Sequence, residues 1–246
     1  MDKLIYVAMS GASQINLAQK AHANNLANIS TTGFQRDLEQ ARSMPVFGEV
    51  HPSRAYAMSE RPGTDFSMGP MIETGRSLDV ATNGNGYIAV QTPDGGEAYV
   101  RTASMNVDAL GVLRAANGMP VMGNAGPIAV PQNTTIEVGK DGTVSIRAEG
   151  EGPRVIAEID RIKLVNPAVD GLEKGPDGLI HTKSGQAAAA DANIELTSGF
   201  LEGSNVNAVD EMTSIMALSK QFELQIKMMT SAKENDEASA RVMQIG

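Results

Sequence analysis

The residue types that could support catalysis are few and widely spaced in this chain. Carboxylates such as Asp65, Asp79, Glu97 and Asp108 could pair across a cleft, as the two acids of a glycan-cleaving site do. The sequence has no Trp and only 4 Tyr, which leaves no aromatic platform on which a sugar could stack. We therefore interpret these carboxylates as surface charge and keep a secreted cell-wall glycan-acting enzyme as a distant alternative.

Metal, thiol and nucleotide chemistry find even less support. The sequence has no Cys, which excludes disulfides, thiol nucleophiles and thiolate metal sites. His22, His51 and His181 are scattered without metal-ligand spacing. Gly84-Asn85-Gly86 lacks the following helix and Lys-Ser/Thr of a phosphate loop, so we interpret it as a hairpin turn. The pattern predicts no catalytic residue, no cofactor-binding residue and no metal ligand.

Charge and composition narrow the class of protein. A formal net charge of −9 without a dense basic run argues against nucleic acid as a partner. The 25 Gly and 11 Pro in 246 residues favour short strands joined by turns over a helical bundle. The longest strongly apolar run is Leu4 to Met9, whereas a membrane span needs about 20 residues and a signal peptide needs a basic lead. We expect neither direct membrane insertion nor a cleaved signal peptide.

Two amphipathic stretches, one at each end of the chain, are the elements expected to carry function. The first runs from Asp2 to Thr32 with Gly33 as its stop, and the second runs from Asn207, the expected helix cap, to Val242. The first repeats at alternating steps of four and three, which is heptad spacing: Leu4, Ala8, Gly11, Ile15, Ala18, His22, Asn25 and Ile29. Neither stretch has enough apolar sequence beside it for local burial. We expect the two helices to pack as a coiled-coil pair, and then against other copies or relatives of the chain.

The sequence between these stretches predicts antiparallel strands. From Gly75 onward, turn signals such as Pro93-Asp94-Gly95-Gly96 and Lys140-Asp141-Gly142-Thr143 recur about every 8 to 12 residues. The expected fold class is α+β, with long terminal helices and an inserted antiparallel β-rich domain. The expected segments are an N-terminal helix at 1–34, an extended connector with one or two short strands at 35–74, the β-rich domain at 75–197, and a return segment with the C-terminal helix at 198–246.

Several stretches, in order along nearly the whole chain, resemble one protein family. Ala23–Phe34, with its Ala-Asn-Asn-Leu-Ala-Asn run followed by Thr-Gly-Phe, resembles the N-terminal signature of the bacterial flagellar axial proteins, the rod and hook family. Ser198–Asn207 resembles the family's C-terminal return, and Gly75–Val80 resembles the start of its β insert. Within the family, Met1–Tyr6 and Gln221–Met229 are most similar to the proximal-rod members.

The resemblance implies a function. It implies a structural subunit of the flagellar basal-body rod that polymerises through its terminal helices into the helical drive shaft needed for motility. Another axial subunit, such as distal rod or hook protein, is the nearer alternative. The implied partners are other copies and other proximal and distal rod subunits, with transient contact to the flagellar type III export apparatus. The implied location is the periplasmic rod, reached without a cleaved signal, and neither catalysis nor a cofactor is implied.

The resemblance also implies an assembly interface. Asn24, Asn25 and Asn28 are interpreted as polar contacts that fix register in this interface, with solvated amides at a fraying helix end as the alternative. The C-terminal methionines are either plain core or an adaptable recognition surface. The predicted interface residues are Leu4, Ile15, Asn24, Asn25, Leu26, Asn28, Thr32, Gly33, Phe34, Leu201, Ser204, Asn205, Val206, Asn207, Met212, Ile215, Met216, Phe222, Ile226 and Met229.

Overall fold

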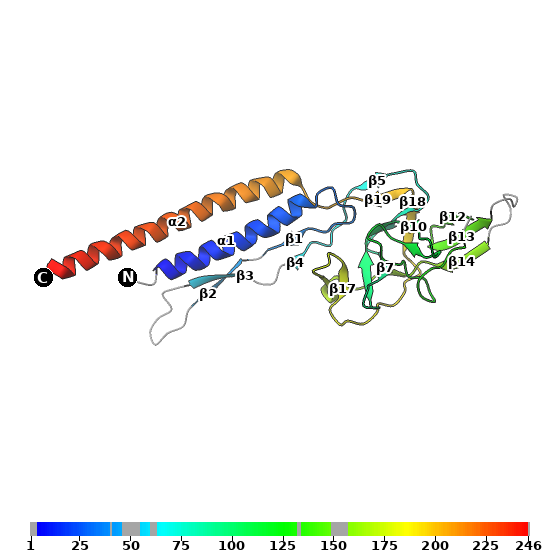
Figure 1. The fold of residues 1–246 in the computed structure, drawn as a ribbon, viewed down its shortest axis with the longest axis horizontal. Helices are drawn as coiled ribbons and strands as arrows, with labels where there is room; N and C mark the ends of the chain where they lie inside the picture. The colour runs from blue at the N-terminus through cyan, green and yellow to red at the C-terminus, as the bar shows by residue number, and fades with distance from the viewer. Residues whose placement is uncertain are drawn as a thin grey trace. The chain divides into compact units, whose positions relative to one another are not determined.

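The structure is a computed structural model that describes residues 4–39, 41–45, 55–59, 63–131, 134–148 and 157–245. Its internal contacts divide the chain into two compact units (Figure 1). Unit 1 comprises residues 1–29, 36–65 and 206–246, and unit 2 comprises residues 30–35 and 66–205. A long helix lies toward each end of the sequence with antiparallel strands between them, so the predicted α+β class is confirmed.

Unit 1 is built around α1 (Leu4–Ala27) and α2 (Ala208–Ile245). The two helices lie side by side and run in opposite directions (Figure 1). Gln19 Nε2 donates a hydrogen bond to Ser219 Oγ at 3.0 Å, and Gly11 lies against the side chain of Gln225. A residue earlier in α1 therefore meets a residue later in α2, as antiparallel packing requires. The terminal helices pack on each other within one chain.

α1 ends at Ala27, several residues before the predicted stop. The Asn28 N–H is shared between the carbonyls of Asn24 and Asn25, both at 3.1 Å. The Asn28 side-chain amide donates to the Asn24 carbonyl at 3.0 Å and to the Asn24 Oδ1 at 2.7 Å. Such local side-chain bonds satisfy groups at the end of a helix and compete with another helical turn. The prediction of helix as far as Thr32 was therefore wrong.

Residues 36–65 add short strand pairs to unit 1. β2 (Ala41–Pro45) and β3 (Ala55–Ser59) pair antiparallel, and β3 packs on α1. β1 (Asp37–Leu38) pairs antiparallel with β4 (Gly63–Thr64). The sequence suggested an extended connector over this stretch. The structure instead groups most of that stretch with the helices.

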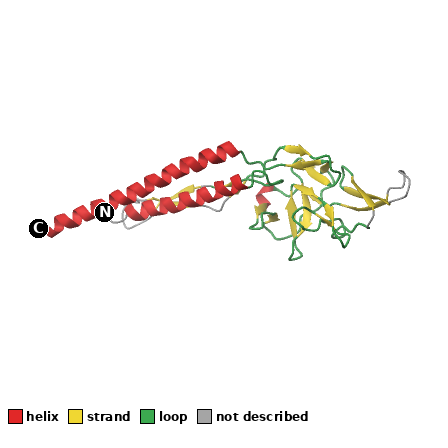
Figure 2. Cartoon of the chain, turned by 45° about the horizontal axis from the view of Figure 1, so that its top comes forward, coloured by secondary structure: helices red, strands yellow, loops and turns green. Residues whose placement is uncertain are grey.

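Unit 2 consists of short antiparallel strands joined by tight turns (Figure 2). A five-stranded sheet has the order β15 (Leu164–Val165), β7 (Tyr87–Gln91), β8 (Glu97–Val100), β17 (Ile180–Thr182) and β16 (Leu172–Lys174). Two three-stranded sheets have the orders β18 (Glu195–Ser198), β6 (Asp79–Asn83), β9 (Thr102–Ser104), and β12 (Thr134–Val138), β13 (Thr143–Ala148), β14 (Ala157–Arg161). The shorter elements are β5 (Met71–Glu73) paired with β19 (Phe200–Glu202), β10 (Asn106–Val107) paired with β11 (Leu113–Arg114), and the 3-10 helix η1 (Val169–Gly171).

The core of unit 2 lies on both faces of the five-stranded sheet. Successive side chains of a strand point to opposite faces. Along β7, Ile88 and Val90 join the larger apolar cluster, and Tyr87 and Ala89 join the smaller one. Because both faces are covered, β7 is an almost uninterrupted apolar run instead of an alternating pattern.

The segment 83–86 is not the hairpin turn that the sequence suggested. β6 pairs with β9 and β18, whereas β7 pairs with β8 and β15, so the segment carries the chain from one sheet to another. The Gly86 carbonyl holds this crossing in place, because it accepts Thr82 Oγ1 at 2.8 Å and Arg101 Nη1 at 2.6 Å. The turns at 93–96 and 140–143 do close antiparallel pairs, β7 with β8 and β12 with β13, as predicted.

Candidate assembly site

Two of the carboxylates that might have formed a catalytic pair, Glu97 and Asp108, are instead bound to cations. Glu97 accepts two hydrogen bonds from Lys163 Nζ, at 2.7 and 2.9 Å. Asp108 accepts Arg114 Nε at 2.6 Å, and this bond, together with the Val112 N–H, holds the pKa of Asp108 below its usual value. A carboxyl with a lowered pKa stays ionised near neutrality and is a poor proton donor there. These groups stabilise turns and strands of unit 2.

The described part of the chain has neither a metal-binding cluster nor a helix that could cross a membrane. No group of three or more His, Cys, Asp or Glu there could hold a metal ion; His51 lies outside the described residues. No helix described here combines the length and apolarity that crossing a membrane requires.

A buried polar cluster joins the helices of unit 1. This Glu211 cluster comprises His22, Asn25, Arg36, Asp37 and Glu211. The Glu211 side chain is almost fully buried; it lies 2.5 Å from His22 Nδ1 and 3.7 Å from Arg36 Nε, and Asn25 Nδ2 donates to it at 3.4 Å. Asn25 also bonds the Asp37 backbone twice, accepting its N–H and donating to its carbonyl, both at 2.9 Å. The cluster therefore ties α1, the segment after it and the first turn of α2 together.

The three predicted asparagines have different environments. Asn25 has no exposed surface and is committed to contacts inside the chain. Asn24 is exposed, and Asn28 is half-buried and bonded to Asn24. A role for these amides between subunits stays a prediction.

Two faces of α2 differ in burial. The first, here called the seam, holds buried or half-buried residues at steps of three and four: Glu211, Ile215, Leu218, Phe222, Gln225, Met229 and Ala232. The second, here called the outer stripe, exposes Val209 (66%) and three residues that each follow a seam residue by one position, Met212 (52%), Met216 (72%) and Ile226 (43%). The six apolar α2 residues of the predicted interface divide evenly between them. Ile215, Phe222 and Met229 are on the seam, and Met212, Met216 and Ile226 are on the outer stripe.

The predicted residues of α1 and the following turn are spread over several environments. Leu4 is the first residue of α1, Ile15 and Leu26 are half-buried within it, and Thr32 is exposed beyond its end.

In unit 2, the Gly33-Phe34 pair lies against the return segment. The Gly33 N–H donates to the Glu202 carbonyl at 2.8 Å, and the Asn205 N–H donates to the Phe34 carbonyl at 3.3 Å. The Lys174 ammonium lies 3.8 Å from the Phe34 ring centroid, a cation–π contact, and donates to the Gln35 carbonyl at 2.9 Å. Residues 30–35 are thus held at several points by unit 2.

A buried ion pair supports this junction. Arg101 and Glu202 have side chains 1% and 2% exposed, and the Arg101 Nε donates to Glu202 Oε2 at 2.9 Å. Glu202 Oε1 accepts the Gly69 N–H at 2.9 Å, and the Arg101 guanidinium lies 5.2 Å from the ring centroid of Tyr87. Sequence reasoning missed both residues of the pair, because residues about a hundred positions apart give no periodic signal.

Most of the predicted interface residues in the return segment are buried or hydrogen-bonded within the chain. Ser204 and Val206 are buried, and Leu201 is half-buried in β19. Asn205 Nδ2 donates to the Ser67 carbonyl at 3.1 Å. Asn207 Oδ1 accepts the Val209 N–H at 3.0 Å, which confirms the predicted cap of α2.

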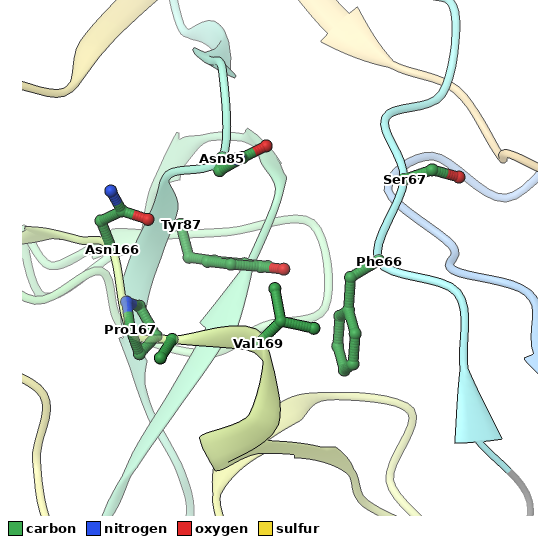
Figure 3. Close-up of a pocket in the computed structure, with 8 residues that line it drawn as sticks. Phe66, Ser67, Asn85, Tyr87, Asn166, Pro167 and Val169 are labelled. Atoms are coloured by element: carbon green, nitrogen blue, oxygen red, sulfur yellow. The ribbon is translucent and has the colours of Figure 1, made fainter.

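Unit 2 also has an open pocket of about 600 Å³. Its lining is Phe66, Ser67, Asn85, Tyr87, Asn166, Pro167, Ala168 and Val169 (Figure 3). Figure 3 shows the Tyr87 hydroxyl directed toward the segment that carries Phe66 and Ser67. Burial raises the pKa of Tyr87, so its phenol stays protonated near neutrality. The lining offers amides and aromatic rings but no pair of groups suited to acid–base catalysis.

Family comparisons agree with the order of elements along the chain. Residues 5–35 match the model described as flagella basal body rod protein. Residues 81–146 match the flagellar hook protein FlgE/F/G D1 domain, and residues 197–242 match the flagellar basal body rod FlgEFG protein C-terminal model. Most of α1 and α2, the unit 2 strands from β7 to β12 and the return segment thus fall within models of one class of axial flagellar protein.

Relatives along the whole chain narrow this class. The flagellar basal-body rod protein FlgF of Escherichia coli is 41% identical over 241 residues, and that of Salmonella typhimurium is 39% identical over 242; each alignment covers 96% of both chains. The rod protein FlgG of Bacillus subtilis is 31% identical over 258 residues, covering 95% of this chain and 96% of the relative. The chain belongs to the flagellar basal-body rod protein family. It is a structural subunit of the rod, and the quoted FlgF relatives are more similar to it than the quoted FlgG relative.

Proposed function

We propose that the chain is a proximal-rod subunit and that it polymerises through its terminal helices. Its greater identity to the quoted FlgF relatives than to the quoted FlgG relative favours the proximal position over the distal rod or hook. In this proposal α1 and α2 act as a coiled-coil pair, and contacts between unlike faces of successive subunits build a helical assembly because such contacts do not close on themselves.

The observation that carries the proposal is the exposure of the outer stripe. Val209, Met212 and Met216 lie one helical turn apart along α2 and are each more than half exposed. A row of large apolar side chains facing water marks a surface suited to a partner. Met adapts its shape to different neighbours, which suits a subunit that contacts both copies of itself and other rod proteins. The exposed Asn24 and Thr32 are further candidates for this contact.

The remaining parts of the proposal concern segments and location. We infer that residues 1–34 and 198–246 supply the assembly helices and the return segment, and that 75–197 forms an insert outside the polymer contacts. The proposed subunit catalyses no reaction, reaches the periplasm through the flagellar type III export apparatus without a cleaved signal, and contacts that apparatus transiently.

The position along the rod is tested by quantitative mass spectrometry of purified basal bodies. The count of this chain relative to the other axial subunits should be a few copies for a proximal-rod subunit. Many copies would instead indicate a distal rod or hook protein. Absence from intact, functional basal bodies would overturn the structural proposal.

The contact surface is tested with the double variant Met212→Gln and Met216→Gln. Both side chains are exposed in unit 1, so the free energy of unfolding of the monomer should change by less than about 0.5 kcal/mol per site. Incorporation into basal bodies and swimming should be lost or strongly reduced. The matched control is Leu110→Gln, which alters an 84% exposed side chain in unit 2 and should assemble normally. Normal incorporation of the double variant would contradict a role for the outer stripe.

A further inference from the structure

α2 could in principle present either of two apolar faces to α1. The seam contributes Ile215, Leu218, Phe222 and Met229, and the outer stripe contributes Val209, Met212, Met216 and Ile226. The number and size of these side chains are similar. Apolar burial alone, which is roughly proportional to area, therefore discriminates poorly between the two faces.

The α1 side of the interface adds little selectivity. Its most buried apolar residues are Ala8 and Ala12, and Gly11 lies between them on the side that meets Gln225. Small side chains form shallow holes, so a helix can slide past them with little loss of interlocking. Among the described residues, the buried Oε1 atoms of Gln14 and Gln225 have no hydrogen-bond partner, so these amides do not favour one alignment either.

Glu211 differs from every other seam residue because its partners are specific. It binds His22 and Asn25 on α1 and lies near the Arg36 guanidinium. Asp37 contributes its backbone N–H, which donates to the Asn25 side chain. These groups come from the two elements packed against the first turn of α2. A slip by one turn would move the carboxylate by about 5.4 Å along the axis and away from all of them.

We propose that Glu211 is the register-determining residue of the helix pair. A buried carboxylate without partners is strongly disfavoured, whereas a paired one adds little stability beyond an apolar side chain of the same size. Glu211 therefore selects one face and one register by penalising the others. The selected register leaves the outer stripe facing outward, where a neighbouring subunit could bind it. That consequence rests on the proposed function, whereas the register itself does not.

The register can be read by disulfide cross-linking, because the chain has no cysteine of its own. The Gln19→Cys, Ser219→Cys pair reports the observed register, since these two side chains are in contact at 3.0 Å. The Gln19→Cys, Glu223→Cys pair reports a slip of one turn. In the dilute full-length chain, mild oxidation should cross-link the first pair and leave the second unlinked.

The test substitution is Glu211→Leu in both cysteine backgrounds. We expect the 19–223 cross-link to rise to a yield comparable with the 19–219 cross-link, while the thermal midpoint stays equal or rises. The conservative Glu211→Gln, which can still bond Asn25, should keep most of the preference for 19–219. Glu234→Leu, on an exposed part of α2, removes the same charge and should change neither yield.

The alternatives to this proposal give different results. Exclusive 19–219 cross-linking in Glu211→Leu, with a lowered midpoint, would reduce Glu211 to an ordinary structural residue. Equal yields in the parent chain would show that no register is selected at all. If Glu211→Leu does not fold, Asn25→Leu and His22→Leu remove the partners from the α1 side and should cause the same slip. Because all cross-links form in the monomer, a failure of the assembly proposal leaves these results unchanged.

Discussion

The two units of this subunit are stabilised by different means. Unit 2 buries large apolar side chains completely, among them Ile88, Met105, Leu113 and Ile162. Within the described residues of unit 1, the buried apolar side chains are those of Ala8, Ala12, Val206 and Ala232. At about 25 cal/mol per Å² of apolar surface, small side chains contribute much less.

This difference supports the proposed division of roles, in which unit 2 is self-sufficient and the helices of unit 1 supply the polymer contact. Unit 2 has a core and a buried ion pair that fix its strands without a partner. The helices of unit 1 are aligned by a polar cluster and leave large apolar side chains exposed. In the proposed assembly, neighbouring subunits cover these side chains and add stability to the helix pair.

The largest effect should follow from breaking the ion pair of unit 2. Arg101→Met removes the cation from the buried Glu202 side chain, which among the described residues keeps a hydrogen bond from the Gly69 N–H. Removing one partner of such a pair costs about 3–5 kcal/mol. Urea unfolding of the full chain, followed by circular dichroism of the β signal, should show this loss.

Two controls separate the pair from the rest of the unit. Adding Glu202→Leu to Arg101→Met should restore part of the stability, because the uncompensated charge is gone. Arg147→Ala breaks a pair whose side chains are 35% and 55% exposed, and should change the free energy of unfolding by less than about 1 kcal/mol. A free energy of unfolding lower in the Arg101→Met, Glu202→Leu double variant than in Arg101→Met alone would contradict this account.

The next prediction compares the loss of stability caused by an Ile→Ala substitution in each unit. Ile88→Ala should cost about 2–5 kcal/mol, because Ile88 is fully buried in a close-packed core. Ile215→Ala, at a half-buried seam position of α2, should cost about 1 kcal/mol or less in the monomer. Equal losses in urea titrations of the two variants would remove the distinction between a self-sufficient unit and a partner-dependent one.

The sequence predicted this division in outline. Heptad spacing and turn signals are local properties, so they gave the terminal helices, the cap at Asn207 and the turns at 93–96 and 140–143. The end of α1 was placed too late, because the side-chain bonds of Asn28 compete with helix in a way that spacing does not reveal.

The parts that sequence reasoning missed depend on distant contacts. The pairing of β6 and β7 with different sheets, and the meeting of Arg101 with Glu202, are tertiary results without a periodic signal. From the sequence alone, Glu211 is an acidic residue in the first turn of α2, where it favours the helix dipole. Its burial could not be anticipated, since an acidic side chain at a helix start is usually solvated.

A smaller loss of stability should come from substituting Gly33, which lies where residues 33–34 meet the return segment. Its φ of 70° is in the left-handed region, which costs a residue with a Cβ about 1–2 kcal/mol. A Cβ at Gly33 would also lie 3.0 Å from the Thr102 side chain. Gly75→Ala is the matched control, because Gly75 has the same φ with open space around it. Gly33→Ala should therefore lower the free energy of unfolding slightly more than Gly75→Ala, and equal losses would show that the Thr102 contact relaxes at no cost.

The smallest effect should be a pH-dependent one in unit 2. The pKa of Asp108 is lowered by Arg114 and by the Val112 N–H, so the ionised carboxylate stabilises the folded turn. A lowered pKa means that this contribution is complete above the ordinary value of 3.8 and is lost as pH falls through the folded pKa. Asp108→Asn should therefore lower the thermal midpoint slightly at pH 7, and the difference from the parent chain should shrink as the pH approaches 3. Asp94→Asn, in another exposed turn of unit 2, controls for the change in net charge. A midpoint difference for Asp108→Asn that stays constant from pH 7 to pH 3 would show that the turn depends on the shape of this side chain and not on its charge.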